Sequence, residues 1–227
     1  MSPVNSFLSQ SFAIATTFPK ISTNGLTLHL DAGQQISYTG GNVWKDLSGK
    51  DSSATLFNDP TYTTDNGGLF SFNGSYGICS GSPLNPNSYT KSVWFRLSSY
   101  SSNNNLVSCD PGHFMFFSGT DKLYCGHSDW GWYNAFPSAT DFSLGTWYNA
   151  CLTFNTDDGM VLYVNGVQDS TYTATKTPAP GSGIEIASFS SGNLLIGDIA
   201  EVLVYNRSIT EAEVKQNFNA LKSRFGI

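Results

Sequence analysis

The sequence predicts an all-β fold, a β-sandwich or barrel followed by one C-terminal α-helix. Three observations predict it: apolar and polar residues alternate in several short runs, turn residues separate these runs, and helical periodicity is confined to the end of the chain. The chain has 227 residues, of which 40% are hydrophobic and 14% aromatic, and can bury one sizeable core. We expect one domain over residues 25–227, preceded by an arm over residues 1–24.

Alternation with a period of two defines the predicted strands. In GLTLHLDAG (25–33) the leucines face one side and the polar residues the other, as in a half-buried strand. The runs SVWFRLSS (92–99) and WYNACLTFN (147–155) alternate in the same way, and LLIGDIAEVLVYNR (194–207) supplies one or two closing strands. These runs predict strands with one face in a core.

Turn signals join the strands. HFMFFSGTDKLYCGH (113–127) predicts two strands around a turn at residues 118–121. The pair Asn165-Gly166 stands between strand-forming residues and predicts a tight hairpin, because both central residues of such a turn need φ > 0.

The last residues predict a helix over 211–224. Thr210 and Glu213 fit a capping box, and Ile209 and Val214 occupy the positions of a hydrophobic staple. One apolar stripe is formed by Val214, Phe218 and Leu221. We expect this stripe to cover part of the sandwich, and packing on a partner protein is the alternative.

The arm, residues 1–24, is rich in serine and threonine yet carries several large apolar residues. It is expected to be extended and to pack either on its own domain or on a neighbouring subunit. The candidates for docking on a partner are Phe7, Leu8, Phe12 and Phe18.

Composition argues against several partners. The net charge is -6, and the eleven lysines and arginines form no basic cluster, so no nucleic-acid partner is expected. No apolar run approaches the ~18 residues of a membrane-spanning helix, and the N-terminus is a poor secretory signal, so we expect no membrane partner and synthesis in a cytoplasm. The four cysteines form no CxxC pair, which argues against structural zinc and leaves reduced thiols as the expectation.

The acidic residues do not predict a glycosidase. A retaining glycosidase needs two carboxylates roughly 5 Å apart, and on one strand these stand at i and i+2 or i+4. Glu185 has alanine at i+2, and Asp198 and Glu201 would face opposite sides of a regular strand. The three histidines lie in strand patterns without a GxSxG motif, and His29 is interpreted as a solvent-facing strand residue. We expect no catalytic residue, no metal ligand and no enzyme.

The segment SDWGWYNAFPSATDF (128–142) is the most interesting candidate binding loop. Aromatic faces with polar neighbours suit sugar stacking or a protein interface. The alternative is that these aromatic residues fold inward and close the end of the sandwich. The candidates are Asp129, Trp130, Trp132, Tyr133, Asn134 and Phe136.

Several pieces occur in an order that resembles a known family. They are GLTLHLDAG, SVWFRL, LGTWYNACLTFN, GMVLYVNGV and IGDIAEVLVYNR followed by a helix. Together they resemble the laminin G-like domains of the concanavalin A-like lectin/glucanase superfamily, and WKDLSG, DNGG and NALKSRFGI are most similar to versions found in tailed-phage virions. The resemblance implies a jelly-roll sandwich of two antiparallel sheets. Many relatives bind calcium at a sandwich edge, so a calcium ion stays open as an alternative to the absence of any cofactor.

The resemblance leaves the function open, because this fold carries lectins, enzymes and structural modules alike. We expect a non-catalytic virion protein of a phage, a head decoration or a tail or fibre component, assembled in the host cytoplasm. It would display the sandwich through contacts with other virion proteins, including copies of itself. The alternative is a carbohydrate-binding adhesion module that recognises host-surface glycans.

Overall fold

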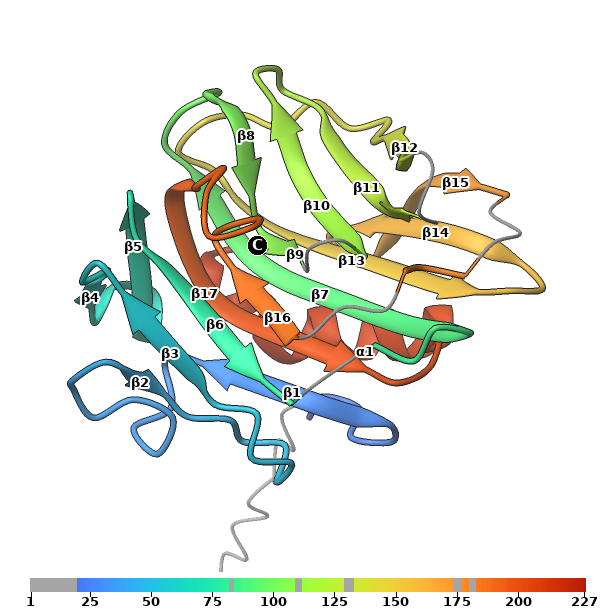
Figure 1. Ribbon diagram of the computed structural model, residues 1–227. Coiled ribbons are helices and arrows are strands. Elements are labelled where there is room, and N and C mark those ends of the chain that lie inside the picture. The colour runs from blue at the N-terminus through green and yellow to red at the C-terminus, as the bar shows by residue number, and fades with distance from the viewer. Residues whose placement is uncertain (1–19, 82–83, 109–111, 129–132, 174–176, 180–182) are drawn as a thin grey trace, which may run out of the picture.

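The computed structural model describes residues 20–81, 84–108, 112–128, 133–173, 177–179 and 183–227. Within these ranges the chain forms a two-layered β-sandwich with one α-helix on its outside (Figure 1), and every strand pair is antiparallel. The predicted all-β sandwich with a C-terminal helix is confirmed. The docking candidates of the arm, Phe7, Leu8, Phe12 and Phe18, lie outside the described residues.

The first layer is a sheet of eight described strands. They run in the order β15-β14-β13-β7-β17-β5-β4, and β1 pairs with β17 as well. The bounds are β1 Leu26–Asp31, β4 Thr61–Thr63, β5 Leu69–Asn73, β7 Ser88–Leu97, β13 Trp147–Asn155, β14 Gly159–Val164, β15 Val167–Tyr172 and β17 Ile196–Tyr205. β5 and β1 share one edge of β17, with β5 along Ile196–Ile199 and β1 along Glu201–Tyr205.

The second layer consists of two smaller sheets that lie in front of the long strands of the first (Figure 1). The order is β12-β11-β10-β8 in the four-stranded sheet and β2-β3-β6-β16-β9 in the five-stranded sheet, counted over the described residues. Their bounds are β2 Val43–Trp44, β3 Ala54–Phe57, β6 Tyr76–Ser80, β8 Ser102–Asn105, β9 Val107–Ser108, β10 His113–Ser118, β11 Leu123–Ser128, β12 Tyr133–Pro137 and β16 Gly183–Ile186. A short 3-10 helix, η1 Asp65–Gly67, precedes β5.

The core lies between the layers and follows the predicted alternation. Leu28 and Leu30 of β1 and Val93 and Phe95 of β7 all point inward and are fully buried. Each large apolar side chain buried in this way stabilises the fold by roughly 1.5–3 kcal/mol. The predicted hairpin is confirmed as well, because β14 and β15 meet at Asn165-Gly166 with φ of 50° and 76°.

Two of the three described cysteines, Cys79 and Cys125, belong to this core, and Cys151 packs with Ile209 and Val214 on the outer face of the eight-stranded sheet. Cys79, Cys125 and Cys151 are buried, and no disulfide joins any two of them. Burial raises the pKa of Cys125 and of Cys151 to about 12, so both stay protonated thiols at neutral pH. These thiols act as small apolar residues.

The outer face of the eight-stranded sheet is covered by the C-terminal segment. Helix α1 spans Glu211–Leu221, and the 3-10 helix η2 follows over Lys222–Phe225 and ends at Gly226 with a left-handed φ of 74°. The α-helix therefore ends three residues before the predicted position, because Leu221 leaves helical geometry at φ -125°. The predicted capping box, staple and apolar stripe are confirmed, and the stripe covers the chain's own sandwich. Neither α1 nor any other described helix is long and apolar enough to cross a membrane.

Glu213 connects the start of α1 to two other segments. Its carboxylate pairs with the Arg207 guanidinium and accepts hydrogen bonds from Thr210 and from Ser22 Oγ, the latter at 2.7 Å. The Arg207 hydrogen bond is the largest cause that holds the pKa of Glu213 well below its usual range. The end of the predicted arm, residues 20–24, is thereby attached to the helix.

We expect Glu213→Gln to lose about 1 kcal/mol of stability at pH 7, the sum of a partly exposed ion pair and a capping-box interaction. A carboxyl whose folded pKa is lowered stabilises above its unfolded pKa, ~4.3, and this contribution is lost as the pH falls below that value. The difference in the free energy of unfolding between variant and wild type, measured by urea unfolding, should therefore become smaller from pH 5 to pH 3. Glu211→Gln, an exposed neighbour on the same turn, is the control. An equal pH dependence in wild type and Glu213→Gln would contradict the assignment.

Candidate functional site

A pocket of about 250 Å³ opens on the outer face of the four-stranded sheet. Phe114 and Phe116 of β10 point into it, because the residues between and after them, Met115 and Phe117, point into the core. The remaining lining comes from β8 and from the loop between β16 and β17. We call it the amide–phenyl pocket, and its lining residues are Asn103, Asn105, Phe114, Phe116, Phe189 and Asn193.

Hydrogen bonds and ring contacts hold the lining in place. Asn105 is buried, and its Nδ2 donates to the backbone carbonyls of Asn103 at 3.1 Å and Asn193 at 3.0 Å. The Phe116 ring stacks on Tyr124 at 5.7 Å between centroids and meets Phe114 edge to face at 5.5 Å. The pocket wall is therefore built in advance of any ligand.

The loop that closes the pocket is strained. Ala187, Ser190, Ser191 and Asn193 all have left-handed φ between 47° and 61°, which non-glycine residues rarely adopt. The Glu185 carboxylate holds this loop by accepting hydrogen bonds from Ser188 Oγ at 2.6 Å and from two backbone N–H groups. Strain of this kind concentrates at ligand-binding sites, where the surrounding structure maintains it.

The lining determines what the amide–phenyl pocket can do. Asparagine amides both donate and accept hydrogen bonds, and phenyl faces offer flat apolar surface. None of the six lining residues titrates, so the described lining contains no general acid, base or nucleophile. This chemistry suits a neutral polyhydroxyl ligand that is bound without being transformed.

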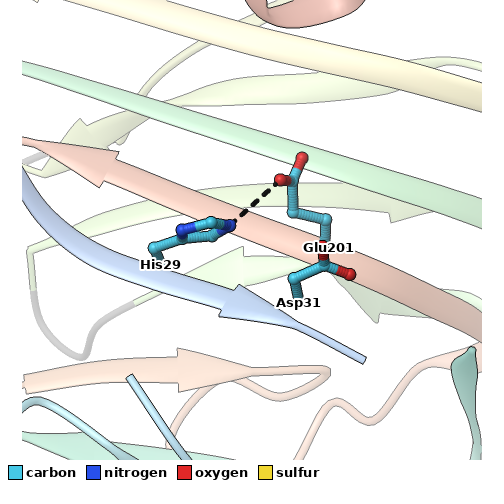
Figure 2. A group of neighbouring side chains, drawn as sticks. All are labelled: His29, Asp31 and Glu201. Carbon is cyan, nitrogen blue, oxygen red and sulfur yellow. Dashed lines mark ion pairs between the residues drawn. The ribbon is translucent and has the colours of Figure 1, made fainter. Parts of the chain in front are cut away.

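A second cluster lies on the outer face of the eight-stranded sheet. Asp31 of β1 and Glu201 of β17 are directly paired across the strands, and His29 stands two residues before Asp31. Figure 2 shows the His29 ring turned toward the Glu201 carboxylate, with 3.3 Å between Nε2 and Oε1. Ligand atoms of all three residues lie within 4.8 Å of one another. We call this group the His29 cluster.

The surroundings of the His29 cluster determine its charge. Arg224 of η2 donates from Nη1 to Asp31 Oδ1 at 2.6 Å, and the Gly33 N–H donates to the same oxygen at 2.8 Å. Burial opposes the charge on His29, but Glu201 and two other carboxylates outweigh it and raise the pKa of His29. Burial also raises the pKa of Glu201. The cluster borders a pocket of about 540 Å³ that extends to residues 20–23 and 220–221.

The predicted binding loop is only partly described. Three of the candidates lie outside the described residues: Asp129, Trp130 and Trp132. Strand β12 begins with two others, Tyr133 and Asn134. Phe136 is buried and stacks on Tyr172 at 5.7 Å, so it follows the inward-folding alternative. For the other five candidates the binding role stays a prediction.

Two sequence interpretations of the large sheet are wrong. His29 does not face solvent, because the C-terminal segment covers that face and leaves its side chain only 16% exposed. Asp198 and Glu201 do not face opposite sides, because β17 is irregular between Ile199 and Glu201, and the extra residue turns both carboxylates outward. Asp198 there pairs with Arg96 at 2.7 Å. The other two histidines, His113 and His127, are buried between the layers as structural residues.

Sequence reasoning also missed both sites. The alternation in HFMFF signals that Phe114 and Phe116 share one face, but nothing local shows that the loop at residues 187–193 lies over them. The pairing of Asp31 with Glu201 joins positions about 170 residues apart, so no spacing along the chain reveals it.

Comparison with known proteins agrees with this architecture. The profile described as "Concanavalin A-like lectin/glucanases superfamily" matches residues 71–215, more than half of the chain. No curated protein matches the sequence. Similar solved structures include the receptor-binding domain of botulinum neurotoxin type G, with 17% identity and a TM-score of 0.65; the match covers 86% of this chain and 51% of that chain. They also include the binding domain of Paraclostridial Mosquitocidal Protein 1, with 17% identity and a TM-score of 0.68, and this match covers 87% of this chain and 52% of that chain. A third is the Trypanosoma rangeli sialidase in complex with the inhibitor DANA, with 16% identity and a TM-score of 0.62; the match covers 85% of this chain and 32% of that chain.

These similarities are similarities of fold. The chain spans about half the length of the two toxin domains and about a third of the sialidase. The receptor binding named for the neurotoxin domain, the binding named for the mosquitocidal protein and the inhibitor named for the sialidase belong to those longer proteins.

Proposed function

Because the chain belongs to the concanavalin A-like lectin/glucanase superfamily, we propose that it is a non-catalytic binding module whose amide–phenyl pocket holds a neutral carbohydrate. The observation that carries the proposal is the described lining: three asparagines and three phenylalanines, with no titratable side chain among these described residues. Phe116 and Phe189 offer ring faces to a sugar, and the amides of Asn103 and Asn193 offer hydrogen bonds to its hydroxyl groups. An anionic sugar would find no cation among these residues.

We further propose that the module is displayed on a tailed-phage particle, as a head decoration or a tail or fibre component. The support is the similarity of WKDLSG, DNGG and NALKSRFGI to virion versions of the domain. Residues 1–24 would attach the module to other virion proteins, and the pocket would recognise host-surface glycans. Attachment to the particle and sugar recognition are compatible, because they use different parts of the chain.

The buried carboxylate pair does not contradict a non-catalytic role. Asp31 and Glu201 are adjacent, but their side chains are only 4% and 3% exposed, and Arg224 and Gly33 occupy Oδ1 of Asp31. A glycosidase needs both carboxyl groups in contact with the sugar, one as acid and one as nucleophile or base. The amide–phenyl pocket lies on the opposite layer of the sandwich and contains neither group.

A glycan array followed by calorimetry on the best ligand tests the proposal. Wild type should bind neutral glycans in preference to sialylated or uronic-acid glycans. Phe116→Ala should weaken binding at least about tenfold, roughly 1.4 kcal/mol, through the loss of one stacking face. Phe57→Ala removes a partly exposed ring from the neighbouring sheet and is the matched control. Failure of wild type to bind any neutral glycan, or full affinity in a folded Phe116→Ala protein, would refute the assignment of the pocket, and release of sugar fragments would refute the non-catalytic role.

A further inference from the structure

We propose that His29, Asp31 and Glu201 form a binding site for a divalent first-row transition cation, with Mn²⁺ and Zn²⁺ as the representative ions. Figure 2 shows the three side chains together on β1 and β17. The site lies on the outer face of the eight-stranded sheet, on the other side of the sandwich from the amide–phenyl pocket. It is independent of carbohydrate binding.

The donor set comes from strand pairing. Asp31 and Glu201 are direct cross-strand partners and His29 is on the same face of β1, so three donor groups share one patch of sheet. Their ligand atoms lie within 4.8 Å of one another. Ligands ~2.1 Å from a common ion stand ~3–4 Å apart, so the three groups would close by about 1 Å around an ion. Rotation of the glutamate side chain covers such a distance.

The unpartnered ring nitrogen of His29 points to a ligand. Nε2 of His29 is buried and has no hydrogen-bond partner, because its 3.3 Å contact with Glu201 is poorly aligned. The Glu201 side chain is only 3% exposed, and its Oε1 lies 3.3 Å from that ring nitrogen. A buried polar atom such as His29 Nε2 is rarely left without a partner, since it then loses its water without compensation. A cation between the ring nitrogen and the carboxylate would satisfy both.

The charge of the surroundings favours a cation. A third carboxylate, Asp46, lies next to His29: its Oδ1 accepts a hydrogen bond from the His29 backbone N–H at 2.9 Å. Among the described residues, Arg224 is the one cation paired with these carboxylates, and its guanidinium is bound to Asp31. Lys20 also lines the adjoining pocket. With a neutral imidazole, the three carboxylates outnumber that one guanidinium, and a divalent ion would supply the missing positive charge.

The ligand types select the kind of ion. An imidazole nitrogen favours transition ions, whereas Ca²⁺ prefers six to eight oxygen ligands. One imidazole and two carboxylates suit Mn²⁺ or Zn²⁺ with water completing the coordination. The adjoining pocket of about 540 Å³ provides room for that water.

Thermal unfolding of the full chain, stripped with a chelator, tests the site. Mn²⁺ or Zn²⁺ should raise the unfolding midpoint of wild type, and Ca²⁺ should not. The apparent Kd should increase at least tenfold in His29→Gln and in Glu201→Gln, which keep side-chain size. Glu211→Gln, an exposed carboxylate removed from α1, should behave as wild type. No midpoint shift with either transition ion, or an equal shift in both cluster variants, would overturn the proposal.

If the variants do not fold, a second measurement on the wild-type protein tests whether the His29 cluster binds the ion. The chain has three histidines, so their ring nitrogens are distinguishable by NMR. Zn²⁺ should shift the ring resonances of His29, and Mn²⁺ should broaden them, while the buried His113 and His127 change less. Unchanged His29 resonances at saturating ion concentrations would overturn the site regardless of the variants.

Discussion

Arg224→Met is expected to lower the free energy of unfolding by about 3–5 kcal/mol, because it leaves a buried carboxylate without its partner. The guanidinium pairs with Asp31 at 2.6 Å and also donates to the backbone carbonyls of Asn66 and Gly68. The Asp31 side chain is only 4% exposed, so water compensates for the lost contact only in part. Methionine keeps the length and apolar character of the arginine stem, so the change isolates the loss of charge and hydrogen bonds.

Urea unfolding followed by tryptophan fluorescence measures this loss. Lys222→Met, two residues earlier in η2, is the control and should change stability by less than about 0.5 kcal/mol, as an amphipathic surface residue does. Adding Asp31→Asn to Arg224→Met should recover part of the loss, since no uncompensated charge then remains. A cost no larger than that of Lys222→Met would show that the Asp31 carboxylate is solvated in the folded protein.

Phe225→Ala is expected to cost about 3 kcal/mol, the lower end of the range for removing a buried phenyl ring. The Phe225 ring stacks on Trp94 at 4.2 Å with 16° between the planes and lies 4.6 Å from Trp147. Both tryptophans stand on the outer face of the eight-stranded sheet and are covered by the C-terminal segment. Removing the ring takes away these contacts and exposes part of the sheet surface that the C-terminal segment covers.

The same variant has a spectroscopic signature. Exposure of Trp94 should shift native tryptophan emission to longer wavelength. Phe225→Leu, which keeps apolar contact without the aromatic stack, should lose roughly half as much stability and shift the emission less. A Phe225→Ala protein within 1 kcal/mol of wild type, with unchanged emission, would mean that α1 alone covers the sheet.

Sequence reasoning succeeded where structure is determined locally. The Asn165-Gly166 hairpin depends on two residues that tolerate positive φ, and the start of α1 depends on the four residues Thr210–Glu213, so each can be predicted from a short window. Alternation assigned Trp94 to the face opposite Phe95 correctly. It could not show that this face is covered, because the covering residues follow more than 100 positions later.

The sites could not be predicted because they depend on pairings between distant segments. A search for carboxylates along one strand cannot find Asp31 beside Glu201, since that neighbour relation exists only once β1 has paired with β17. One irregular position in β17 also reverses the expected side of Asp198 relative to Glu201. The amide–phenyl pocket likewise needs the loop at residues 187–193 to lie over β8 and β10, which strand periodicity does not encode.

The attachment of residues 20–22 to α1 determines how the module can be mounted. Gln216 donates to the Lys20 carbonyl, and Asn217 accepts from the Ser22 N–H, so the chain enters the sandwich beside the same helix that leads to residue 227. Lys20 and the residues that follow α1 therefore lie on the same outer side of the eight-stranded sheet. A support on that side would leave the opposite layer, with the amide–phenyl pocket, pointing away from the support.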